Sequence, residues 1–201
     1  MTNTSDALAR EAQQRRAAEA VLADLDLIRR WDCYGRSALV GAFAYGLLAD
    51  PDIDLEIYCP DLRIEHGFQV LGECALNDKV AGVRFTNELG GPDKALYWQI
   101  RYKAEDGLEW KIDMWSAPAD YALPRSEDLV EPMRASLTPE TRYTILELKE
   151  LRREDPSLRC ASVDLYRAVL DDGVRTPDEL RTWLGANETG KLTDWKPRKL
   201  S

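Results

Sequence analysis

The sequence has few of the residues on which several familiar kinds of active site depend. It contains a single histidine, His66, and four scattered cysteines without a Cys-x-x-Cys pair. Any mechanism with a histidine base would need that one residue, whose surroundings, "IEHGF", show no nucleophile motif. The cysteine spacing supports neither a disulfide framework nor a zinc ribbon. These absences exclude the common triads and cysteine-based metal sites as first hypotheses.

Long apolar runs and positive charge are also scarce. No run approaches the roughly 20 apolar residues of a membrane-spanning helix, and "MTNTSDALAREAQQRR" lacks the basic-then-apolar order of a secretion signal. We therefore expect a cytoplasmic protein without a membrane partner. There are 27 Lys and Arg residues against 36 Asp and Glu residues, a net charge of -9. This balance disfavours nucleic acid as a partner, because such binding relies on cations that neutralise phosphates.

The 201 residues, 44% hydrophobic, suit one compact domain or a core domain with a helical appendage. We place the boundary between residues 1–117 and 118–201. The first part opens with apolar residues at helical spacing, which predicts one long amphipathic helix from Ser5 to about Asp32. In the second part, "TPETRYTILELKELRRED", "CASVDLYRAVLDDG" and "TPDELRTWLGAN" each predict a helix, and a polar, basic tail follows.

The middle of the chain predicts strands. A short apolar strand from Ser37 to Val40 ends at Gly41 and precedes one or two helical turns, and "DIDLEIYC" alternates apolar and polar residues. "PDLRIEHGFQVLGECALND" predicts a helix and "KVAGVRFTNEL" a strand, and "ALYWQIRYKAEDGLEWKIDMWSA" predicts a hairpin that turns at "AEDG". The fold class expected from this order is α+β.

Two carboxylates, Asp52 and Asp54, project from the same face of the alternating strand. They repel each other unless a positive charge lies between them, and Mg²⁺ is the natural candidate because it prefers carboxylate oxygens. The simpler alternative is a solvated acidic face on an edge strand. Against it, aspartate is a poor strand former, and a third carboxylate, Asp113, lies among the apolar and aromatic residues of another strand.

Together, these residues resemble the polymerase-β-type nucleotidyltransferase superfamily, in particular its small, antibiotic-nucleotidyltransferase-like members. The resemblance rests on Gly41 after a short strand, on "DIDL", and on Asp113 in "EWKIDMW", and it spans about Ser37 to Trp115. It implies a mixed sheet flanked by helices. It also implies that Asp52, Asp54 and Asp113 hold Mg²⁺ and that Asp113 is the third ligand or the base.

The resemblance further implies that Gly41 and Ala42 form the turn that holds the triphosphate. The family's usual serine after the glycine is Ala42 here, so only backbone N–H groups could replace its hydroxyl contact. The polar residue often found before the first aspartate is Pro51. Tyr45 is a candidate for stacking on a base, with packing against the sheet as the alternative. Lys111 is a candidate for contacting a phosphate, with an ion pair to the aspartates as the default.

The leading hypothesis is a Mg²⁺-dependent nucleotidyltransferase. It would transfer a nucleoside monophosphate from a triphosphate such as ATP to a hydroxyl of a small molecule or a protein and release pyrophosphate. The acidic composition suggests a cationic acceptor. One rival is a non-catalytic relative that binds a nucleotide or a protein partner as a regulatory or antitoxin-like module, and Ala42 supports it. The other rival is the solvated acidic face, which requires Asp113 to lie far from Asp52 and Asp54.

Overall fold

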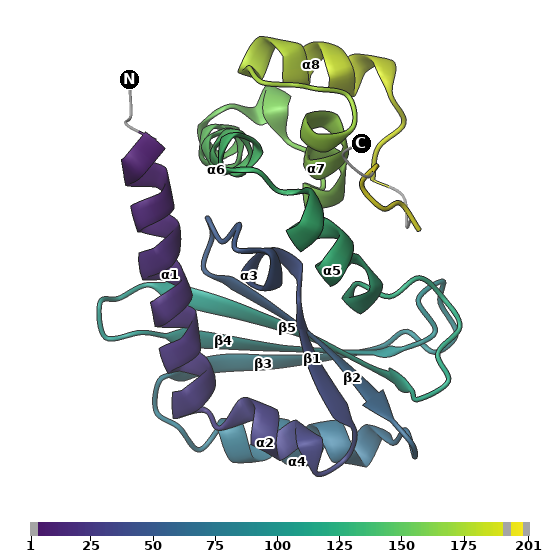
Figure 1. Ribbon diagram of the computed structural model, residues 1–201. Coiled ribbons are helices and arrows are strands. Elements are labelled where there is room, and N and C mark those ends of the chain that lie inside the picture. Colours follow the sequence, from purple (N-terminus) through teal and green to yellow (C-terminus); the bar gives the residue numbers. More distant parts are fainter. Residues whose placement is uncertain (1–3, 191–193, 199–201) are drawn as a thin grey trace.

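The computed structural model describes residues 4–190 and 194–198 and shows a five-stranded sheet with helices on both faces (Figure 1). The strands are β1 (Arg36–Val40), β2 (Asp52–Cys59), β3 (Val80–Asn87), β4 (Leu96–Lys103) and β5 (Glu109–Pro118). The first helices are α1 (Thr4–Asp24), α2 (Leu27–Asp32), α3 (Gly41–Tyr45) and α4 (Ile64–Cys74). After the sheet come α5 (Glu127–Ser136), α6 (Pro139–Glu154), the 3-10 turn η1 (Pro156–Leu158), α7 (Ser162–Leu170) and α8 (Pro177–Ala186).

The sheet is mixed, with the strand order β1-β2-β5-β4-β3. Strands β2 and β5 are parallel, and the other neighbours are antiparallel. The alternation in β2 sets its two faces: Ile53, Leu55 and Ile57 are fully buried toward α2 and α4, while Asp52 and Asp54 face the other side. Figure 1 shows α3 and α5 to α8 on that other side. The predicted α+β fold with a mixed sheet is confirmed.

One hydrophobic core lies between the sheet and α2 and α4. Its largest fully buried side chains include Trp31 of α2 and Trp98 of β4, whose ring centroids are 6.2 Å apart. Gly67 of α4 lets the helix approach the sheet, because a Cβ atom there would lie 2.2 Å from Trp98 Cζ2. This glycine weakens helix propensity in the sequence, and the structure explains its presence by that close approach.

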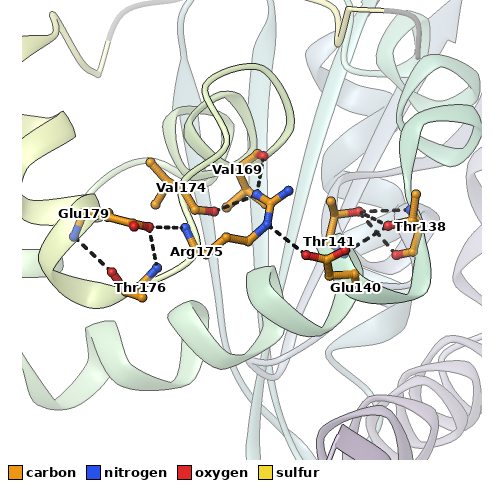
Figure 2. A network of polar contacts seen from close by, with 8 residues as sticks. All are labelled: Thr138, Glu140, Thr141, Val169, Val174, Arg175, Thr176 and Glu179. Atoms are coloured by element: carbon orange, nitrogen blue, oxygen red, sulfur yellow. Dashed lines mark hydrogen bonds and ion pairs between the residues drawn. The ribbon is translucent and has the colours of Figure 1, made fainter. Parts of the chain in front are cut away.

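A second core holds α5 to α8 together, and capping contacts fix the starts of its helices. The Thr138 hydroxyl accepts a hydrogen bond from the Thr141 N–H at the start of α6, and Thr176 makes the same bond with Glu179 at the start of α8. Arg175 joins the two caps by pairing with a carboxylate in the first turn of α6 (Figure 2). The predicted starts of both helices are confirmed.

The structure differs from the sequence predictions at two helices. The predicted helix from Ser5 to Asp32 is divided at Asp26, whose φ of 48° is left-handed and ends the first helix. Helix α5 was not predicted; it contains Pro132, which removes one backbone donor and hides the helical pattern. Asp26 therefore separates two helices, whereas Pro132 is accommodated inside one.

The predicted boundary at residue 118 coincides with the end of β5, and a division into two domains stays a prediction. Residues 191–193 and 199–201 of the predicted polar tail lie outside the described residues. The part at 194–198 packs against α7. Within the described residues, no helix has the length and apolar character needed to cross a membrane.

Candidate active site

Three carboxylates meet on the face of the sheet that carries α3. The parallel pairing of β2 with β5 places Asp54 directly opposite Asp113 and places Asp52 opposite Lys111. One oxygen from each of the three carboxylates lies within 4.8 Å of the other two. The hypothesis that Asp113 lies far from the other two aspartates is therefore wrong. The predicted convergence of the three carboxylates is present in the fold.

Side chains from β4 and β5 fix the orientation of Asp113. The Tyr97 hydroxyl and the Gln99 Nε2 atom donate hydrogen bonds to Asp113 Oδ1 over 2.7 and 3.0 Å. Lys111 Nζ lies 2.8 Å from Asp113 Oδ2 and 3.2 Å from Asp52 Oδ2. Although burial opposes it, contact with these two aspartates raises the pKa of Lys111 above its usual value. Lys111 therefore forms the ion pair that was its default role.

Burial makes the negative charge of this cluster costly. Asp52 Oδ1 is buried, and no hydrogen-bond donor among the described residues reaches it. Burial raises the pKa of Asp52, against the effect of Lys111. Burial, followed by the charges of Asp52 and Asp113, raises the pKa of Asp54 to about 7. Three carboxylates that share one ammonium favour a further positive charge, and these oxygen ligands suit a divalent cation such as Mg²⁺.

We expect the metal-free protein to lose stability as the pH rises from about 5 to about 8. The folded state holds the Asp54 proton more tightly than the unfolded chain does, so this contribution is complete at low pH and disappears as the pH passes about 7. The expected loss is about 2 to 3 kcal/mol in the free energy of unfolding. Melting temperatures in a chelating buffer would measure it. In the variant Asp54→Asn, the melting temperature should fall less steeply with pH than in wild type. An equally steep fall in the variant would contradict this explanation.

Gly41 lies directly beside Asp54. Val40, the last residue of β1, pairs with Asp54, and the chain then turns into α3 with a φ of 63° at Gly41. A Cβ atom at this position would lie 2.2 Å from Asp54 Oδ2. The glycine is thus required both by the backbone conformation and by the carboxylate.

The other two residues predicted near the nucleotide, Ala42 and Tyr45, belong to α3. Tyr45 is buried and meets Tyr166 edge to face, with ring centroids 5.8 Å apart. Ala42 packs partly against the core below the sheet. Both residues also line a cavity that opens over Asp52 and Asp54. Tyr45 therefore combines the packing role that was its alternative with a position on the cavity wall.

A cavity of about 430 Å³ opens over the aspartates. Gly41, Asp52 and Asp54 line one side of it, and α5, α6, α7 and the C-terminal segment line the rest. Its walls include four cationic side chains: Arg125, Lys149, Arg152 and Lys196. The size lies within the range of small-molecule sites. The cavity thus brings carboxylates and cations together around one open space.

Sequence reasoning missed Lys149, the most buried of these cations. Only 2% of the residue is exposed, and its Nζ atom donates a hydrogen bond to the Leu47 carbonyl over 2.9 Å. The Lys149 ammonium also lies 5.6 Å from the centre of the Tyr166 ring. The signal in the sequence was its spacing: Lys149 follows Ile145 by four residues and so lies on the apolar face of α6.

The third acidic residue on this face of β2, Glu56, has a structural role. Its carboxylate accepts hydrogen bonds from the backbone N–H groups of Ser126 and Glu127, at the start of α5, and from the Tyr58 hydroxyl. A carboxylate at a helix start satisfies backbone donors and complements the helix dipole. Strand β2 therefore provides two residues for the carboxylate cluster and one that fixes the position of α5.

A second, smaller hollow of about 200 Å³ adjoins the cavity. Tyr58, Trp115 and Tyr121 form aromatic walls, and Asp93 adds a carboxylate. Trp115 lines both spaces. It lies two residues beyond Asp113 on the same face of β5, so the hollow continues the cavity along the strands.

Comparison of the sequence with protein-family models and with curated proteins gives no match. Solved structures do match. The Cid1 poly(U) polymerase with MgGTP bound aligns with a TM-score of 0.60 at 12% identity, over 83% of this chain and 54% of that one. A cytoplasmic RNA terminal U-transferase aligns with a TM-score of 0.56 at 13% identity, over 83% and 50%. The chain therefore spans about half the length of these structures.

These similarities establish the fold. The chain shares the nucleotidyltransferase-like fold of the matched structures, which is the fold class that the residues around "DIDL" predicted. The names of the matched proteins describe transfer to RNA, and they give no support to the expectation that nucleic acid is disfavoured as a partner.

Proposed function

We propose that the protein is a Mg²⁺-dependent nucleotidyltransferase that transfers a nucleoside monophosphate from a nucleoside triphosphate to a hydroxyl group. The observation that carries this proposal is the convergence of Asp52, Asp54 and Asp113 beside Gly41, at the edge of a cavity with cations on its far walls. Carboxylates would hold the metal, and cations would hold the phosphates that it does not neutralise.

In the proposed reaction, the acceptor oxygen bonds to the α-phosphorus, and the bond from this phosphorus to the pyrophosphate oxygen breaks. Asp52 and Asp54 would be ligands of Mg²⁺, which would neutralise charge on the phosphate oxygens in the transition state. Asp113 would be the third ligand or would accept the proton of the hydroxyl. Its fixed orientation, set by Tyr97 and Gln99, suits either role.

We propose that the triphosphate lies against the turn at Gly41 and Ala42. The two residues of this turn can offer only their backbone N–H groups, because neither has a polar side chain. Lys149 and Arg152, three residues apart on α6, would replace the contact that a serine hydroxyl makes in the family. Arg152 also lies 3.6 Å from Asp50 and donates a hydrogen bond to Ser162, so it is held at the wall of the cavity. Only Lys149 is deeply buried, and a buried cation interacts more strongly with phosphate than one in water does.

Tyr45 and Lys111 remain proposed contacts of the nucleotide. Tyr45 lines the cavity beside the phosphate turn. Lys111 borders the carboxylates through its ion pairs, and its ammonium would turn toward a phosphate when a metal neutralises Asp52 and Asp113.

For the acceptor we propose a hydroxyl of a small molecule or a protein. The hollow beyond Trp115 has aromatic walls and a carboxylate, which suit a small cationic compound. The net charge of -9 favours the same class. The names of the matched structures suggest an alternative acceptor, the terminal hydroxyl of an RNA. The assay should therefore include an RNA acceptor.

The experiment combines binding with turnover. Mg²⁺ with the preferred triphosphate, at about a hundred times its Kd, should raise the melting temperature by about 5 to 10 °C. Pyrophosphate release is then measured with an aminosugar, a protein and an oligoribonucleotide as acceptors. A melting shift without release from any acceptor would favour the non-catalytic module that Ala42 suggests. The absence of a shift with all four triphosphates would overturn the proposed function.

A further inference from the structure

The C-terminal segment 194–198 is fastened to α7 by buried carboxylates. Asp171, whose side chain is 5% exposed, accepts hydrogen bonds from the Trp195 indole N–H over 2.7 Å and from the Arg198 backbone N–H over 2.9 Å. A second contact joins α7 to Gly190, which precedes the segment in the chain. The Asp164 carboxylate of α7, which is 6% exposed, accepts a hydrogen bond from the Gly190 N–H over 2.9 Å. Because both carboxylates are buried, they depend on these donors for hydrogen bonds, so the attachment satisfies polar groups that solvent barely reaches.

This segment forms part of the wall of the cavity over the aspartates. Asp194, Trp195 and Lys196 line the cavity together with Ser162 and Val163 at the start of α7. Trp195 is half-buried and packs against the second core, which holds α5 to α8 together. Pro197, two residues further along the chain, is buried. The indole is therefore held in one orientation at the cavity surface.

Four large aromatic side chains line the cavity, and they differ in what already covers them. Tyr45 and Tyr166 are buried against each other. Trp115 contacts Tyr97, with ring centroids 4.9 Å apart, and borders the second hollow. Trp195 comes from outside the sheet and lines the cavity beside Val163. Trp195 therefore offers an indole surface on the wall formed by α7 and the C-terminal segment, whereas Asp52 and Asp54 line the cavity from the sheet.

The proposed position of the phosphates leaves this side for the base. Phosphates beside Gly41, the metal ligands and Lys149 would occupy one side of the cavity, so the nucleoside would extend toward its other walls. An aromatic face stacks on any nucleobase and contributes about tenfold or more to affinity. We propose that Trp195 is the stacking platform for the nucleobase and that Asp171 is a positioning residue that holds it. This inference rests on the proposed function.

The test compares two ligands that share phosphates and differ in the base. Dissociation constants are measured by calorimetry, with Mg²⁺, for the tightest of the four triphosphates and for inorganic tripolyphosphate. In the full-length variant Trp195→Ala, the nucleotide should bind about tenfold more weakly, while tripolyphosphate should bind within twofold of wild type. Trp195→Phe keeps an aromatic face and should restore most of the nucleotide affinity.

A matched pair of variants tests the anchor. Asp171 and Asp172 are neighbours, and each accepts a hydrogen bond from an indole, that of Trp195 or that of Trp183. Asp171→Ala should weaken nucleotide binding severalfold and leave tripolyphosphate unchanged. Asp172→Ala should change neither, since Trp183 is not among the residues that line the cavity.

The outcomes separate this inference from the proposed function. If Trp195→Ala binds the nucleotide as well as wild type does, Trp195 is not the platform, although the function stands. If that variant loses nucleotide and tripolyphosphate equally, its effect is on the whole site and the stacking role is wrong. If wild type binds neither the nucleoside triphosphate nor tripolyphosphate, both the proposed function and this inference are wrong.

Discussion

Replacing Asp54 with asparagine is expected to lower the rate of pyrophosphate release by a factor of about a thousand or more. Asp54 faces Asp113 across the parallel strands, and one carboxylate fewer would weaken the proposed metal site. A bound metal contributes several kcal/mol to stabilising the transition state, and each 1.4 kcal/mol corresponds to about a tenfold change in rate. The measurement is the initial rate with saturating triphosphate and Mg²⁺.

The same substitution should leave the fold intact. An asparagine is nearly isosteric with the aspartate and removes one of three crowded negative charges, so the metal-free protein should be no less stable than wild type at pH 8. Asp61→Asn is the matched control, because Asp61 follows the same strand but is exposed and paired with Arg63. A variant at Asp54 that keeps more than a tenth of the wild-type rate would contradict the assigned role.

Replacing Gly41 with alanine is expected to damage both stability and activity. The left-handed conformation costs a residue with a Cβ atom about 1 to 2 kcal/mol. The added atom would also lie 2.2 Å from Asp54 Oδ2, so the carboxylate or the turn must move. We expect a total loss of about 2 kcal/mol or more in the free energy of unfolding. Turnover should fall by about a hundredfold or more, because displaced ligands lose their positioning.

Gly72→Ala provides the control for Gly41→Ala. Gly72 lies in α4, and beyond the adjoining residues and backbone of that helix no atom lies within 4 Å of the Cβ that alanine would add. Since alanine has a higher helix propensity than glycine, this variant should gain about 0.5 to 1 kcal/mol and keep full activity. Urea unfolding measures both free energies. Equal stability of Gly41→Ala and wild type would show that the turn can relax without cost.

The sequence predicted the parts of the site that follow from local patterns. The period of two in β2 placed Asp52 and Asp54 on one face, and the hairpin signal at "AEDG" placed Asp113 on the second arm of a hairpin. The glycine after β1 marked the turn beside Asp54. Each of these features follows from a short local pattern. The resemblance to a known superfamily implied that the three aspartates share one site, and the structure shows that the pairing of β2 with β5 brings them together.

The remainder of the site depends on contacts between distant segments. Lys149 and Trp195 line the cavity because the tertiary fold brings α6 and the C-terminal segment to the same space as β2, and no local sequence pattern predicts that arrangement. Glu56 resembled a solvated residue because its partners, at the start of α5, lie seventy residues away in the chain. Two helix predictions were also wrong in detail. Asp26 adopts a left-handed conformation that divides the predicted first helix, and Pro132 lies inside a helix that was not predicted.

The period of two in β2 also has a consequence for the fidelity of folding. Asp52, Asp54 and Glu56 share one face, whereas Ile53, Leu55 and Ile57 fill the core on the other. A slip of one residue in the pairing of β2 would drive all three carboxylates into the apolar layer and expose the three aliphatic residues. Misregistered chains would therefore be strongly disfavoured. The carboxylate cluster and the attachment of α5 would form together, in the one register that also buries the core.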